Sequence, residues 1–169
     1  MDKKQPLALI WSIEEPSLTK EGCWHIDVMA TRAGDEEMLG YGWTALWGVS
    51  APTVTAVFAQ REATTCLRLL YSAFTALHDP EDYMEQIGLG WRPSTPRIPG
   101  AMVGSVRGHG AMQVYVRWET SPGAADFMIY PPDSAARAQA VAVLGIQSVA
   151  HIAQATEEAF KRLEWPIPA

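Results

Sequence analysis

The chain has 169 residues, 48% of them apolar, and a formal net charge of −6. Its length and apolar content predict a single domain over residues 1–169, with a core too large for a disordered chain. The acidic balance argues against a general nucleic-acid binder, which usually presents a basic surface.

The cysteines, the N-terminal residues and the longest apolar run each argue against a class of protein. Cys23 and Cys66 are far apart and form neither a zinc-type spacing nor a disulfide framework. The first residues lack the long apolar run of a secretory signal. The run at 138–153 contains polar residues and is shorter than the roughly 20 apolar residues of a membrane span. We therefore expect a cytoplasmic protein with no cofactor, no bound metal and no membrane contact.

Apolar residues in the first half alternate with a period of two, which predicts antiparallel strands joined by short turns. Four strands are expected, near 7–13, 23–30, 38–47 and 53–59. The apolar spacing then changes to three and four residues, which predicts a helix near 61–78. Asp79 followed by Pro80 predicts the cap and first position of a second, short helix that Gly88 ends.

The second half repeats the order of strands and then a helix. Residues 89–98 hold two prolines with a third, Pro99, following, and predict an irregular loop between the halves 1–88 and 99–169. Strands are expected near 101–106, 112–119 and 126–130, with a hairpin turn at Gly108-His109-Gly110. A long Ala- and Val-rich helix is expected near 134–163, although Gly145 costs about 1 kcal/mol inside a helix and could mark a break.

The predicted fold class is α+β. We expect antiparallel sheet or sheets of about 6–7 strands, packed on the helix near 61–78 and on the long C-terminal helix near 134–163. The two halves share no residue-level identity, so a duplication is only suggested by the order of the elements.

A basic segment interrupts the acidic chain, because residues 86–118 contain four arginines and no acid. Arginine and aromatic residues are enriched at the anchor points of protein interfaces. The predicted partner-binding residues are Trp91, Arg92, Arg97, Arg107, His109 and Arg117. Two alternatives stay open: the arginines bind a phosphate or a single-stranded nucleic acid, or they pair with the chain's own acids at 35–37 or 79–85.

Histidine and cysteine side chains are a second set of candidate functional residues, for metal binding or nucleophilic catalysis. Cys23, His25 and Asp27 share one face of a strand, but at a spacing of about 7 Å, which we expect to be too long for hydrogen bonds along the row. The ordinary interpretation is the outer face of a half-buried strand. His151 is expected to be a hydrogen-bonded residue of the last helix, either buried or at the boundary. The sequence carries no Walker loop, no nucleophile elbow and no metalloprotease motif.

These observations favour a small, non-enzymatic binding protein without catalytic residues. It would dock on another macromolecule, a protein rather than a nucleic acid, as an inhibitor or neutralising protein of the immunity or anti-defence kind. A homodimer through the long helix or an edge strand is a further alternative. The rival hypothesis is a small enzyme or small-ligand binder, with a pocket between sheet and helices that uses His25 or His109.

Overall fold

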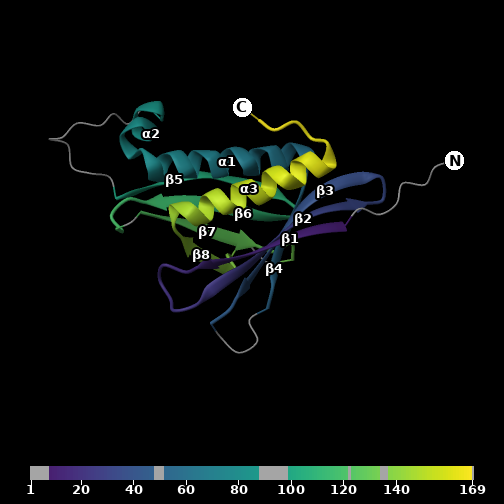
Figure 1. Cartoon of the computed structure of the whole chain (residues 1–169), viewed down its shortest axis with the longest axis horizontal. Helices are drawn as coiled ribbons and strands as arrows, with labels where there is room; N and C mark the ends of the chain where they lie inside the picture. The colour runs from purple at the N-terminus through teal and green to yellow at the C-terminus, as the bar shows by residue number, and fades with distance from the viewer. Residues whose placement is uncertain (1–7, 48–51, 88–98, 122, 134–136, 169) are drawn as a thin grey trace.

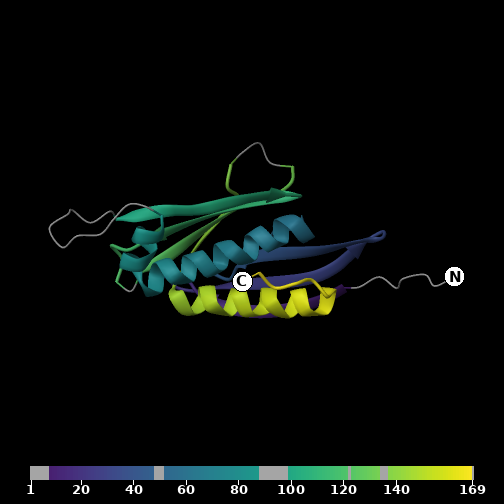
Figure 2. The same ribbon diagram turned by 90° about the horizontal axis from the view of Figure 1, so that it is seen from above.

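The structure, a computed structural model, describes residues 8–47, 52–87, 99–121, 123–133 and 137–168. Two four-stranded antiparallel sheets lie beside two long helices (Figures 1 and 2). The strands of the first sheet are β1 (Ala8–Pro16), β2 (Cys23–Ala33), β3 (Glu36–Ala45) and β4 (Val54–Ala59). The helices that follow are α1 (Gln60–His78) and α2 (Pro80–Gln86).

The second sheet repeats this plan. Its strands are β5 (Gly100–Gly108), β6 (Gly110–Arg117), β7 (Ala124–Tyr130) and β8 (Ala140–Leu144), and helix α3 (Ile146–Leu163) follows them. In both sheets the order of the strands in space is the order in the chain. The α+β class and the antiparallel pairing are therefore confirmed.

Each long helix packs mainly on the sheet of the other half. Helix α1 follows the first sheet but lies chiefly against β5 and β6, whereas α3 follows the second sheet and lies against β1 and β2. The two helices also pack on each other. Helix α3 is further tied to the first sheet, because the buried Tyr41 hydroxyl of β3 lies 2.8 Å from the Thr156 hydroxyl. This exchange interlocks the halves around one hydrophobic core.

The core is built from the inward faces of the strands. Trp43 of β3 and Phe127 of β7 are both fully buried and stack with their rings 5.4 Å apart, so they join the two sheets. The sheets also meet at one edge, where Val57 of β4 and His109 exchange two backbone hydrogen bonds of 2.8 Å. In the described part of the chain, no helix is long and apolar enough to cross a membrane.

The prediction of one long helix near 134–163 is wrong in its first part. Residues 140–144 form strand β8, and α3 begins only after Gly145, whose backbone is extended. Val141 is 48% exposed and the other four residues of β8 are buried, and β8 pairs antiparallel with β7 from Ala125↔Leu144 to Ile129↔Ala140. This strand raises the number of strands to eight, above the 6–7 expected.

Other local predictions are confirmed. The helix near 61–78 is α1, and Asp79 caps α2 by accepting a hydrogen bond from the Asp82 backbone at 3.2 Å. The turn at His109 forms as expected, since Gly110 has φ +99 and a side chain there would meet the Tyr130 carbonyl. The predicted loop 89–98 lies outside the described residues.

Replacing Phe127 by Ala should remove the contact that joins the sheets. We expect a loss of about 3–5 kcal/mol in the free energy of unfolding, measured by urea denaturation, because the ring leaves a cavity in a closed core. The control is Phe74→Ala, since Phe74 is 37% exposed and stacks only on His78; it should cost about 1 kcal/mol or less. Equal losses, or two separate transitions in the wild type, would contradict a shared core.

Candidate functional site

Of the predicted partner-binding residues, the structure describes Arg107, His109 and Arg117, and it places them at the two ends of the β5–β6 hairpin. Arg107 and His109 are exposed at the tip of the β5–β6 hairpin. Arg107 faces Ala111, and Arg117 lies six residues further along β6, which is a distance of about 20 Å. The remaining three residues of the prediction lie outside the described residues: Trp91, Arg92 and Arg97.

Arg117 pairs with an acid of its own sheet. Its Nε and Nη2 donate to Oδ2 of Asp126 on β7 at 2.9 and 2.6 Å. These hydrogen bonds raise the pKa of the Arg117 guanidinium. Arg117 therefore pairs with an acid of its own chain, which was one of the alternatives left open by the sequence. Its partner is Asp126 and not an acid of 35–37 or 79–85.

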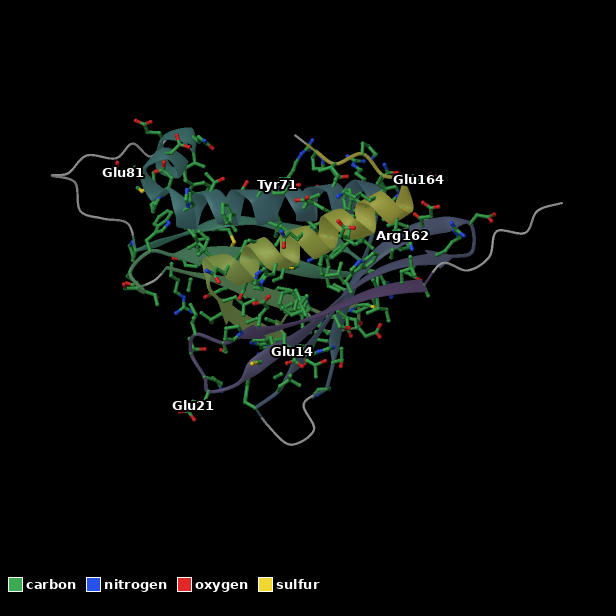
Figure 3. All side chains as sticks on the ribbon, in the orientation of Figure 1. Glu14, Glu21, Tyr71, Glu81, Arg162 and Glu164 are labelled. Atoms are coloured by element: carbon green, nitrogen blue, oxygen red, sulfur yellow. The ribbon has the colours of Figure 1, made fainter. Side chains whose placement is uncertain are left out.

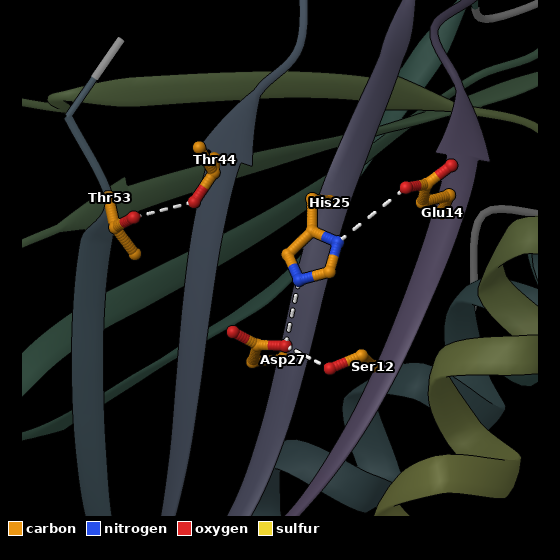
Figure 4. Close-up of polar contacts among 6 residues, drawn as sticks. All are labelled: Ser12, Glu14, His25, Asp27, Thr44 and Thr53. Atoms are coloured by element: carbon orange, nitrogen blue, oxygen red, sulfur yellow. Dashed lines mark hydrogen bonds and ion pairs between the residues drawn. The ribbon is translucent and has the colours of Figure 1, made fainter. Parts of the chain in front are cut away.

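The outer face of the first sheet carries a polar row (Figure 4). His25 Nε2 lies 3.0 Å from Asp27 Oδ1, and the Ser12 hydroxyl donates to the same oxygen at 2.6 Å. The expectation that this spacing forbids hydrogen bonds along the strand is wrong, because the long imidazole side chain spans the gap. Glu14 lies 3.9 Å from the other ring nitrogen. Within the described ranges, no three acidic, histidine or cysteine side chains form a metal-binding group.

Strand β1 and helix α3 lie side by side (Figures 1 and 2). A groove runs between them. Its volume is ≈ 550 Å³. Residues of both elements line it: Trp11, Ser12 and Ile13 from β1, and His151, Gln154, Ala155, Glu157, Glu158 and Lys161 from α3. Glu157 is held by Tyr71 of α1 (labelled in Figure 3), whose hydroxyl donates at 2.9 Å. Burial and this hydrogen bond raise the pKa of Tyr71 to about 12.

Glu15 contacts His151 of the groove and was not foreseen as a functional residue. It is only 4% exposed, and its carboxylate accepts hydrogen bonds from the Ser148 hydroxyl at 2.7 Å and lies 2.7 Å from His151 Nδ1. Helix α3 has Gly145 at its N-cap, no side-chain cap and no acid in its first turn. Glu15 therefore supplies from β1 the negative charge that favours a helix N-terminus.

His151 joins this buried carboxylate to the groove. Nδ1 lies 2.7 Å from the Glu15 carboxylate, so Nε2 is the ring nitrogen left for a ligand. The side chain is 51% exposed, so the ring is accessible to a ligand. The hydrogen bond predicted for His151 is confirmed, whereas its side chain is exposed and not buried or at a boundary.

Strand β1 is an edge of its sheet, and its backbone groups can be assigned to the two sides. Ser17 N–H donates to Gly22 at 3.1 Å across the β1–β2 turn. In an antiparallel pair the residues alternate between bonding to the neighbouring strand and pointing away from it. The odd-numbered residues of β1 thus bond to β2, whereas Ile10, Ser12 and Glu14 direct their N–H and C=O groups to the open side.

Sequence comparison does not add to this geometry. No protein-family model matches the chain, and no curated protein matches it. The function is therefore inferred from the surfaces themselves. Among the described residues, the groove beside β1 combines an open strand edge, a hollow and a histidine fixed by a buried carboxylate.

Removing the Glu15 carboxylate should destabilise the protein. We expect Glu15→Ala to lower the free energy of unfolding by about 1.5–3 kcal/mol, because the buried Ser148 hydroxyl loses its charged acceptor and α3 loses its capping charge. Glu14→Ala is the matched control: Glu14 is 65% exposed and its loss should change stability by about 0.5 kcal/mol or less. Equal unfolding midpoints for the two variants would contradict the assigned role.

Proposed function

We propose that this protein binds another protein by accepting an extended segment of that partner as an additional strand beside β1. The observation that carries the proposal is the open edge of β1 next to the groove under α3. An edge strand beside a helix-lined groove is suited to strand addition, in which backbone hydrogen bonds give affinity and alternate side chains of the partner enter pockets.

The backbone geometry of β1 favours such an added strand. The outward groups of Ile10, Ser12 and Glu14 recur every second residue, about 7 Å apart, which is the repeat of an extended chain. Ile10 is 60% exposed and offers an apolar contact next to this edge. Trp11 and Ile13 point to the other side of β1 and form the floor of the groove.

The charge of the groove selects a basic partner. Glu157 and Glu158 line it, and Lys161 is bound to Glu158 at 3.2 Å. An extended segment with lysine or arginine at alternate positions therefore complements the site.

Two other readings receive less support. A second copy of the chain would bring Glu14 and the acids of α3 against an equally acidic edge, and like charges disfavour that pairing. A small-ligand pocket between sheet and helices would need His25 or His109, but both lie on outward surfaces.

Peptide selection followed by amide exchange tests strand addition directly. Peptides selected from a random library against the intact chain should be rich in Lys or Arg. On binding, NMR-detected hydrogen exchange should slow at the outward amides of Ile10, Ser12 and Glu14, while Trp11 and Ile13, already bonded to β2, should change little.

Two variants at one position distinguish the contribution of the backbone N–H to peptide binding from that of the side chain. Ile10→Pro removes an outward N–H without breaking the ladder to β2 and should weaken peptide binding by about tenfold or more. Ile10→Ala keeps that N–H and should stay within about threefold of the wild type. Equal affinities of the two variants, or peptides that leave the outward amides unprotected, would rule out strand addition.

A further inference from the structure

A second hollow lies on the opposite part of the molecule, on the outer face of the second sheet. It has a volume of ≈ 430 Å³ and is formed where β5 meets β6 and where β7 ends. Ser105 and Arg107 line it from β5, Gln113 from β6 and Tyr130 from β7, and Pro131 and Pro132 follow as its apolar wall. None of these residues belongs to the groove beside β1.

The strand register places the polar side chains of this hollow on one face. Ser105 and Arg107 are two residues apart on β5 and therefore point to the same side. Ser105 is paired with Gln113, and Arg107 with Ala111, whose partner on β7 is Tyr130. The polar side chains of the hollow are thus positioned by the sheet, and the two prolines after β7 complete its wall.

The groups that line the hollow are mainly donors. Gln113 Oε1 accepts a hydrogen bond from the Tyr130 hydroxyl at 3.0 Å, so the Gln113 amide N–H groups are left to donate. Arg107 is exposed and has no side-chain partner among the described residues. The Ser105 hydroxyl adds one further donor. No acidic side chain is among the lining residues, although the chain as a whole has a net charge of −6.

We propose that this hollow binds a phosphate group, either as the free anion or as the phosphate of a small organic monoester. The planar guanidinium of Arg107 matches phosphate oxygens in pairs. Gln113 and Ser105 donate to the remaining oxygens. The Tyr130 ring and the two prolines form an apolar wall on which the organic part of a monoester can rest.

Titration with three ligands tests the site and distinguishes the two sources of phosphate. The full chain is titrated with inorganic phosphate, with a nucleoside monophosphate and with the unphosphorylated nucleoside, at constant ionic strength, and followed by amide NMR. Both phosphate compounds should give saturable shifts at Ser105, Arg107 and Gln113, and the nucleoside should give none. A monoester that binds about tenfold tighter than phosphate identifies an organic ligand, and equal affinities identify the free anion.

A matched pair of arginine variants shows whether the hollow, and not general positive charge, is responsible. Arg107→Gln should weaken phosphate binding by about tenfold or more. Arg68→Gln removes the same charge from an open depression at α1 that also holds Glu36, and should leave binding within about twofold. The proposal is overturned by the absence of saturable shifts up to about 10 mM ligand, or by equal losses in the two variants. Thermal unfolding of both variants checks that the fold is retained.

Discussion

Phe127 stacks on Trp43 where the inner faces of the two sheets meet, and the packing of both long helices depends on that junction. Each sheet alone would expose one apolar face, and the helix that follows it in the chain covers mainly the other sheet. Apolar surface is therefore removed from water only when both halves are in place. The packing of α1 on the second sheet and of α3 on the first makes the burial of each half depend on the other.

The groove beside β1 follows from the same exchange. Because α3 leaves the second sheet at Gly145 and crosses to the first, its N-terminus arrives next to the last residues of β1. Burying the Glu15 carboxylate there carries a desolvation cost, which the hydrogen bonds to Ser148 and His151 offset. The arrangement that fixes the helix also fixes the histidine, so one buried acid serves both the fold and the proposed binding surface.

Periodicity was sufficient for most of the fold because strands and helices bury their residues at different intervals. It failed at 140–144, where alanines are compatible with either state and the alternation of Val141 and Val143 was outweighed by the helical spacing further on. The inward Glu15 could have been found, since it continues the buried side of Leu9, Trp11 and Ile13. The pairing of Arg117 with Asp126 could not, because it depends on how β6 is aligned with β7.

The inward acid on β1 also determines how this strand can pair. A shift of one residue against β2 would turn Glu15 toward solvent and move Glu14 and Pro16 to the interior, with no partner for the displaced carboxylate. An exposed edge normally invites slippage and irregular association between molecules. In this protein the hydrogen bonds of the buried Glu15 fix the register of β1. The outer edge of β1 can therefore stay unpaired while the strand keeps its alignment with β2.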